Sequence, residues 1–305
     1  MPRLLTRLSF KVFSLLDRGG LHVLPKHYYT PIPDYHWLRK NKPLWAGRAS
    51  LTGLHWDLDE QLDWLQELCR PYYNEVAGLE FYSQTVKSGV GTGFGPIESQ
   101  VMHCFVRANA PGQIVEIGSG VSTACMAHAS NLNRNEGRDG SQIICVEPYP
   151  RKEFYNIKNI DHLKKPCQTV PSSTFQQLGP GDLLSIDSSH AVRVGSDVIR
   201  IYLDILPSLA PNVFVHIHDI FLPYLYQRSV LSNYFGWQET SLLLALLINN
   251  SHLSTLACLS ALHYDRPDKL SELLRDYRHR DGLEGLDKSP APSGHFPASL
   301  WLKTC

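Results

Sequence analysis

A short apolar segment that ends in an acidic residue and a glycine turn, Val115-Glu116-Ile117-Gly118-Ser119-Gly120, constrains the fold of this chain most strongly. Glycine permits positive φ angles and lets the backbone approach a ligand closely. In open α/β folds, ligands bind beside such a turn at the carboxyl end of the strands. The segment therefore predicts a strand, a turn and a helix within an α/β sheet, with a small-molecule site at the sheet's carboxyl edge.

Apolar runs rich in valine and isoleucine alternate with helical stretches after residue 112, as in doubly wound α/β domains. The predicted strands are residues 113–117, 142–146, 167–170, 183–186, 212–217, 254–261 and 299–303. The predicted helices are residues 122–130, 194–208, 238–249 and 267–280, and a loop follows over 281–297. The last two strands lack a simple crossover connection, which predicts a seven-stranded sheet closed by an antiparallel pair.

Residues 1–90 are predicted to form a mostly helical N-terminal extension, and residues 91–305 the α/β domain. The first 18 residues mix apolar and basic side chains, which favours an amphipathic helix packed on its own domain or on a sister subunit, with a membrane surface as the alternative. Prolines and aromatic residues, including His27, Tyr28 and Tyr29, crowd residues 24–45 and predict an extended arm that serves as a lid or a dimer contact. Further helices are predicted over residues 57–70, 75–86 and 97–107, with a glycine-rich loop over 89–95.

The charge balance and the cysteine pattern argue against nucleic-acid binding, a disulfide framework and a zinc site. Lysine plus arginine equals aspartate plus glutamate at 29 each, so no general field attracts nucleic acid. The seven cysteines are odd in number and never form a CxxC pair, which disfavours a disulfide framework or a zinc knuckle and favours the cytoplasm. No apolar run reaches the roughly 20 residues that a membrane span needs. We expect a cytoplasmic protein without an integral membrane segment, and a homo-oligomer is compatible with this composition.

The residues around the glycine turn indicate the kind of ligand. The dinucleotide fingerprint asks for a third glycine where this chain has Thr123. Glu116 would repel a pyrophosphate but could accept a hydrogen bond from the ammonium group of a methionine-like moiety. Glu147 ends the next strand, and an acidic residue there can accept both hydroxyls of a ribose. The predicted cofactor contacts are Glu116, Gly118, Ser119, Gly120 and Glu147.

The segments VEIGSGVSTACMA, ICVEPYP, LLSIDSSHAVRVGSDV, PNVFVHIHDIFLPYLY and SLWLK resemble bacterial class I S-adenosylmethionine-dependent methyltransferases. More narrowly, they resemble a branch associated with natural product and glycan modification. The similarity covers roughly residue 89 to the C-terminus, and the HYYTPIPD segment at 27–34 is also typical of that branch. The resemblance implies a Rossmann-like seven-stranded methyltransferase sheet with S-adenosyl-L-methionine over Gly118 and Gly120. It also implies Glu116 near the methionine end and Glu147 on the ribose.

Two polar clusters follow neighbouring predicted strands and should meet at the same sheet edge. His190 is the candidate general base for a hydroxyl acceptor, with Asp187 as a second catalytic residue that also faces the cofactor. Asp187, His218 and Asp219 are predicted ligands of a divalent metal such as Mg²⁺, Mn²⁺ or Fe²⁺. The DxxH spacing resembles metal-dependent macrolide sugar O-methyltransferases, in which the Asp binds metal and the His is the base. That group has paired acidic residues where this chain has His218-Asp219.

Purely structural roles are alternatives for some of these residues. Asp187 could cap a turn, and His216, on a buried strand, is predicted to be structural. Tyr224, Tyr226, Trp237 and Glu239 are predicted to overhang the site, where they could contact a sugar-like or aromatic acceptor or serve packing alone.

The leading hypothesis is an S-adenosylmethionine-dependent O-methyltransferase that acts on a small molecule or glycan. The alternatives are an NAD-dependent oxidoreductase, a metal-dependent hydrolase and a non-catalytic nucleotide-binding partner subunit.

Overall fold

The structure is a computed structural model that describes residues 3–24, 26, 28–227, 229–233, 235–279 and 294–305. His27, and most of the loop expected over residues 281–297, lie outside the described residues.

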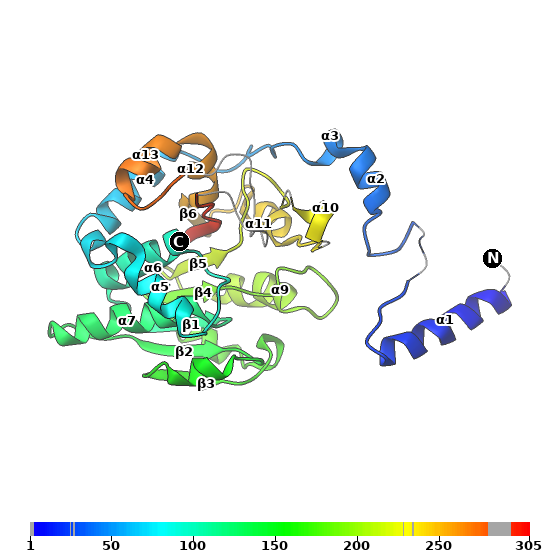
Figure 1. Cartoon of the computed structure of the whole chain (residues 1–305), viewed down its shortest axis with the longest axis horizontal. Coiled ribbons are helices and arrows are strands. Elements are labelled where there is room, and N and C mark those ends of the chain that lie inside the picture. The colour runs from blue at the N-terminus through cyan, green and yellow to red at the C-terminus, as the bar shows by residue number, and fades with distance from the viewer. Residues whose placement is uncertain (1–2, 25, 27, 228, 234, 280–293) are drawn as a thin grey trace.

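Seven strands form one sheet in the order β3-β2-β1-β4-β5-β7-β6 (Figure 1). They are β1 (Gln113–Ile117), β2 (Gln142–Val146), β3 (Ile160–Leu163), β4 (Leu183–Ile186), β5 (Phe214–His218), β6 (Leu253–Cys258) and β7 (Ser299–Thr304). The first five are mutually parallel, whereas β7 pairs antiparallel with both β5 and β6. The predicted sheet closed by an antiparallel pair is therefore confirmed, and the carboxyl ends of β1, β2, β4 and β5 share one edge.

Helices pack on both faces of this sheet. The α-helices of the described residues are α1 (Arg3–Arg18), α2 (Tyr35–Lys40), α3 (Lys42–Trp45), α4 (Leu58–Cys69), α5 (Glu80–Lys87), α6 (Pro96–Asn109), α7 (Val121–Asn135), α8 (Ser173–Gln176), α9 (Asp197–Arg200), α10 (Val230–Asn233), α11 (Glu239–Leu247), α12 (Leu259–Asp265) and α13 (Pro267–Leu273). One apolar cluster joins α4, α6 and α7 to one face of the sheet, and a second joins α11 and the helical segment that begins with α9 to the other. Alternate residues of β1 enter different clusters, Ile114 on the α6 side and Val115 on the α9 side, as strand geometry requires.

The expected strand over residues 167–170 is wrong. The third strand is Ile160–Leu163, and Cys167–Thr169 is a 3-10 turn between Pro166 and Pro171. Strand β3 lies at the sheet edge and its side chains are partly exposed, so its sequence needs no continuous apolar run. The strand expected over 254–261 ends at Cys258, where α12 begins.

The helical expectations need smaller corrections. The helix expected over 75–86 is interrupted by positive φ angles at Gly78 and Leu79, so only Glu80–Lys87 is α-helical. The arm over residues 24–45 is not extended throughout: Asp34 accepts hydrogen bonds from two backbone N–H groups of α2 and caps that helix. The helix expected over 267–280 ends at Leu273.

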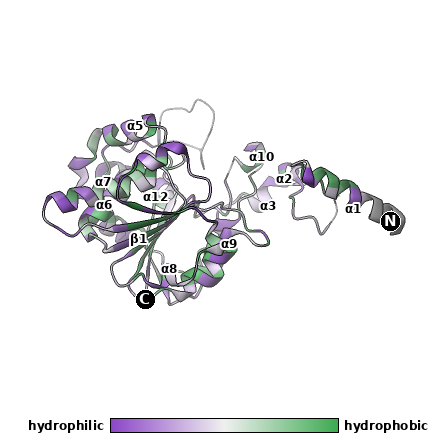
Figure 2. Cartoon of the chain, turned by 90° about the horizontal axis from the view of Figure 1, so that it is seen from below, coloured by the Kyte–Doolittle hydropathy of each residue, from purple (hydrophilic) through white to green (hydrophobic). Residues whose placement is uncertain are grey.

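The N-terminal helix α1 lies away from the sheet and its flanking helices (Figures 1 and 2). Apolar side chains on it are exposed, with Phe10 at 63% and Leu15 at 70%. The expected packing of this helix on its own domain is therefore not seen, and a sister-subunit contact stays a prediction. Within the described residues, no helix is both long and apolar enough to cross a membrane. Six cysteines are buried as small apolar residues, whereas Cys305 is exposed.

Candidate active site

The glycine turn after β1 has the backbone that the sequence predicts. Gly118 and Gly120 adopt φ angles of 110° and 154°. A Cβ atom on Gly118 would lie 2.4 Å from the carbonyl oxygen of Asp187, so only glycine fits beside the neighbouring strand. A Cβ on Gly120 would meet only the carbonyl oxygen of Val90, at 3.5 Å. The turn is thus a backbone cradle between the loop at Val90 and the start of α7, and Ser119 is partly exposed at its tip.

Glu116 lies beneath this cradle. Its carboxylate is fully buried and accepts hydrogen bonds from the hydroxyls of Ser122 and Thr123, each at 2.5 Å. Burial raises the pKa of Glu116 to about 7, although these hydrogen bonds oppose the shift. Thr123, at the position of the missing third glycine, also accepts a hydrogen bond from the Gly120 N–H. Glu116 and Thr123 therefore stabilise the turn from below, and the contact of Glu116 with a ligand ammonium stays a prediction.

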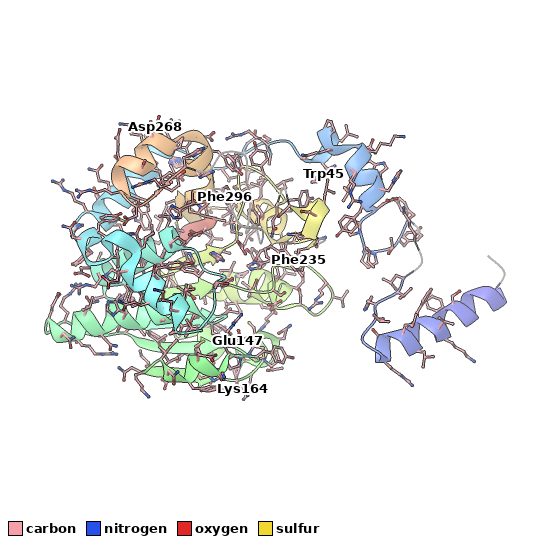
Figure 3. The ribbon with its side chains drawn as sticks, viewed as in Figure 1. Trp45, Glu147, Lys164, Phe235, Asp268 and Phe296 are labelled. Carbon is pink, nitrogen blue, oxygen red and sulfur yellow. The ribbon has the colours of Figure 1, made fainter. Side chains whose placement is uncertain are left out.

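Glu147 lies at the end of β2, next to the cradle. Ile117 pairs with Val146 in the sheet, and the Gly118 N–H donates to the Val146 carbonyl at 3.0 Å. One carboxylate oxygen of Glu147 accepts a hydrogen bond from the Tyr149 N–H at 2.6 Å. The side chain is half-buried and lies in the lower part of the view in Figure 3, and its contact with a ribose stays a prediction.

The four polar residues predicted on β4 and β5 come together. Asp187 Oδ1 lies 3.4 Å from His190 Nε2 and 3.3 Å from His218 Nδ1. Asp219 Oδ2 lies 3.6 Å from His190 Nε2 and 3.8 Å from His218 Nδ1. The two strands are hydrogen-bonded neighbours, with Ile186 opposite Ile217, which explains why residues just beyond their ends meet. We call Asp187, His190, His218 and Asp219 the imidazole–carboxylate cluster.

Two members of this cluster have unusual backbones. His190 and Asp219 adopt φ angles of 57° and 55°, in the left-handed region that non-glycine residues rarely occupy. Such conformations cost free energy and persist where the surrounding structure holds them, commonly at functional sites. With these backbone conformations, the side chains of His190 and Asp219 face each other and the other two members of the cluster.

Glu239 is the partner of His190 that the sequence did not assign. It begins α11, is buried, and its carboxylate lies 2.6 Å from His190 Nδ1. This contact orients the imidazole so that Nε2 faces Asp187 and Asp219. The ring of Trp237 covers the imidazole of His190, with 4.6 Å between the centroids. The sequence placed Trp237 and Glu239 near the site, but only the fold identifies what each one touches.

Burial and neighbouring charges shift the pKa values of this cluster in opposite directions. Burial lowers the pKa of His190, but hydrogen bonds to Asp187 and Glu239 and the charges of Glu239 and Asp219 raise it well above its ordinary value overall. Burial likewise opposes protonation of His218, whereas the charges of Asp219 and Asp187 raise its pKa to about 9. The pKa of Asp187 is lowered because these two imidazoles outweigh its burial. The pKa of Asp219 is raised, mainly by burial.

His216, two residues before His218, behaves differently. Its ring packs against Trp301 and Phe94, and burial lowers its pKa to about 3. Its Nδ1 lies 3.4 Å from the Ser185 hydroxyl. This environment supports the structural role that the sequence predicted.

Glu98 and Phe94 are neighbours of His218 that the sequence did not single out as site residues. Glu98 is buried on α6, accepts a hydrogen bond from the Ala298 N–H at 2.8 Å and lies 3.9 Å from His218 Nε2. Phe94 belongs to the glycine-rich loop, and its ring centroid is 4.9 Å from that of His218. Only the tertiary fold could reveal these contacts.

The predicted metal ligands have suitable chemistry but not a suitable arrangement. Asp187, His218 and Asp219 are chemically suited to a divalent cation. Among the residues that the structure describes, however, no group of three or more His, Cys, Asp and Glu side chains is arranged to hold one. The carboxylates of the cluster lie instead within ion-pair distance of imidazoles. We therefore derive no chemical step through a metal.

Comparison with known proteins agrees with this architecture. Residues 115–220, which contain the glycine turn and the imidazole–carboxylate cluster, match a family model described as a methyltransferase domain. The match covers about a third of the chain, so residues 115–220 are similar to methyltransferase domains, and the seven-stranded Rossmann-like sheet agrees with that similarity.

Solved structures show low similarity to the whole chain. A SAH-bound methyltransferase of Podospora anserina, PaMTH1, is 17% identical over 77% of this chain and 93% of its own, with a TM-score of 0.39. An O-methyltransferase of Bacillus cereus in complex with SAH is 14% identical over 63% of this chain and 90% of its own, with a TM-score of 0.38. Comparison with curated proteins found no match.

Proposed function

We propose that this enzyme transfers a methyl group from S-adenosylmethionine to a hydroxyl oxygen of a small molecule, with His190 as the general base. One observation carries the proposal: the glycine cradle and the imidazole–carboxylate cluster lie on adjacent strand ends. Gly118 touches Asp187, because a Cβ on the glycine would collide with the Asp187 carbonyl oxygen. A methyl donor bound at the turn after β1 would therefore lie next to a base that follows β4, the neighbouring strand.

The residues around the turn fit the cofactor. The backbone of Gly118, Ser119 and Gly120 leaves room for close approach, and Glu147 offers carboxylate oxygens for ribose hydroxyls. Asp187 is exposed enough, at 25% of its side chain, to face a ligand beside the turn. When bound, S-adenosylmethionine supplies an electrophilic methyl group whose transfer leaves the electron pair of the broken S–C bond on sulfur.

The protein's part is to align the acceptor and to remove one proton. As the acceptor oxygen forms its bond to the methyl carbon, its proton passes to Nε2 of neutral His190. Glu239 holds Nδ1 and stabilises the imidazolium that results, as the buried aspartate does in hydrolase triads. The raised pKa of His190 makes it a stronger base, and it must lose its own proton before each turnover.

The finer sequence predictions extend this proposal. The DxxH resemblance favours a sugar hydroxyl and a metal bound by Asp187, His218 and Asp219. Protonated His218 provides positive charge beside Asp187, so the proposed proton transfer to neutral His190 needs no additional cation.

The proposal is tested by incubating the protein with S-adenosylmethionine and separate panels of phenols and methyl glycosides, followed by mass spectrometry. We expect an O-methylated product that forms only with the cofactor present. Acceptor turnover without S-adenosylmethionine would instead support the hydrolase alternative, and acceptor-dependent oxidation of NADH the oxidoreductase.

A further inference from the structure

The N-terminal arm and the segment that carries Trp237 enclose a small cavity beside the active site. Its volume is about 170 Å³. Its side chains come from both segments and are mostly apolar: Pro33, Leu38, Trp45, Val230, Tyr226 and Gln238. Trp45 comes from the arm, at the end of α3, whereas Phe235 comes from the segment beside α10 (Figure 3).

Several contacts fix the arm over this segment. The Arg39 guanidinium donates to the Leu231 carbonyl at 2.9 Å, and the Ala49 N–H donates to the Pro223 carbonyl at 2.7 Å. Arg48 forms an ion pair with Asp265. The Trp45 indole N–H is already used, because it donates to the Leu38 carbonyl at 2.9 Å. The arm is thus a wall of the cavity, anchored on both sides of it.

Gln238, which lines the cavity, forms a hydrogen bond with His190, the proposed base. The Gln238 N–H donates to the His190 carbonyl at 3.2 Å, and the next residue is Glu239, which holds the His190 ring. Phe235 stacks on Trp237 with 5.6 Å between centroids and 3° between planes, and Trp237 covers His190. A molecule in the cavity therefore lies against the short segment that positions the base.

Size and polarity select the kind of molecule. An apolar protein cavity of about 150 Å³ accommodates benzene, so this cavity matches one six-membered ring. Tyr226 and Gln238 provide its polar side-chain groups, apart from the occupied indole of Trp45. A sugar ring would bury several hydroxyls there, and each buried hydroxyl without a hydrogen-bond partner weakens binding. An aromatic ring needs no such partners.

We propose that the cavity between the arm and the side that Tyr226, Val230, Gly236 and Gln238 form is the acceptor site, and that the acceptor is a phenol, whose aromatic ring occupies it. This inference rests on the proposed function and adds the substrate class and the residues that select it. Leu38 and Gly236 lie on opposite walls and determine how large a ring can enter.

The experiment measures binding of phenol and of methyl α-glucoside to the SAH-loaded protein by calorimetry. Leu38→Trp fills the cavity from the arm, and Gly236→Leu fills it from the opposite wall, where a Cβ would be 3.8 Å from Pro33. Leu44→Trp is the matched control, because Leu44 belongs to the same arm but is 75% exposed. We expect phenol to bind the wild type and the control alike, and each filled variant at least ~10-fold more weakly, with SAH affinity unchanged.

The outcomes separate this inference from the function on which it rests. A wild type that binds no SAH would overturn the proposed function itself. If SAH binds and phenol affinity is equal in all variants, only the acceptor site is wrong. Saturation by the glucoside but not by phenol would overturn the aromatic class in favour of the sugar that the DxxH resemblance suggests.

Discussion

Two buried clusters of this protein each combine histidine with carboxylates, yet they differ in what neutralises the charge. At the C-terminal end of α6, Glu75 binds Arg107 through two hydrogen bonds of 2.7 and 2.8 Å and lies 2.7 Å from His103. At the carboxyl edge of the sheet, Asp187 and Asp219 lie against His190 and His218. Among the described residues, the ion-pair partners of those two aspartates are imidazoles.

The difference in cation changes the chemistry of the histidines. Arginine stays charged at any working pH, so its cluster needs no proton from His103. Burial lowers the pKa of His103 to about 4, and that ring stays neutral. In the imidazole–carboxylate cluster the positive charge is carried by protons that can leave. A cluster balanced by arginine suits a structural role, whereas one balanced by protons can take part in acid–base catalysis.

The sharpest test of this contrast removes one imidazole from each cluster. His190→Ala should lower turnover by roughly 10²–10⁴-fold, the range for a lost general base, while SAH affinity stays nearly intact. His103→Ala should leave turnover of the folded protein close to wild type. Steady-state kinetics and calorimetry measure both variants. Parallel losses of SAH binding and rate in His190→Ala would show instead that His190 is structural.

Removal of Arg107, the permanent cation, should lower the stability of the protein and leave turnover of the folded protein close to wild type. Arg107→Met takes the buried guanidinium away from Glu75, which is exposed to solvent, and removes a donor from the buried amide oxygen of Asn133; such a loss costs roughly 1–3 kcal/mol of unfolding free energy. Denaturant unfolding measures it, with SAH affinity of the folded fraction as the control. Reduced turnover at unchanged stability would contradict the structural role of this cluster.

The two clusters should also give opposite pH dependence of stability. His218 has a folded pKa of about 9, above its unfolded value, so its contribution is present below about pH 6.5 and is lost as pH rises toward 9. The full contribution is on the order of 3 kcal/mol. His103 has a folded pKa of about 4, so stability falls as pH drops from about 6.5 toward 4. Unfolding curves of wild type, His218→Asn and His103→Asn across this range test both signs; equal slopes in all three would refute the assignment.

Chelation should have the smallest effect. Because imidazoles provide the positive charge beside Asp187 and Asp219, turnover should stay within about twofold after exhaustive treatment with EDTA. Loss of activity that returns with Mg²⁺ or Mn²⁺ would restore the predicted metal at Asp187, His218 and Asp219.

The sequence predicted those parts of the molecule whose pattern is local. The strand at 113–117, the glycine turn and the polar residues after β4 and β5 lie where expected, since parallel strands place their carboxyl ends together. The edge strand β3 was missed because its residues, Ile-Asp-His-Leu, lack the apolar run of a buried strand.

The partners within the site were beyond sequence reasoning. Glu239 reaches His190 across 49 positions, and no local spacing encodes that contact. The hydroxyls of Ser122 and Thr123 bind the carboxylate of Glu116 beneath the turn, contacts that the sequence did not predict, and the expected contact of Glu116 with a ligand stays a prediction. A one-dimensional pattern gives the strand end on which a carboxylate lies, but not the direction in which the side chain turns.

The central claim is that the turn at Gly118–Gly120 binds S-adenosylmethionine, and calorimetric titration with SAH tests it most directly. The account predicts that SAH binds at one site per chain while NADH does not. Glu147→Ala should weaken SAH binding by roughly 10- to 100-fold, the loss of about 1.5–3 kcal/mol from charge-assisted hydrogen bonds. Absence of SAH binding, or SAH binding that Glu147→Ala leaves unchanged, would contradict it.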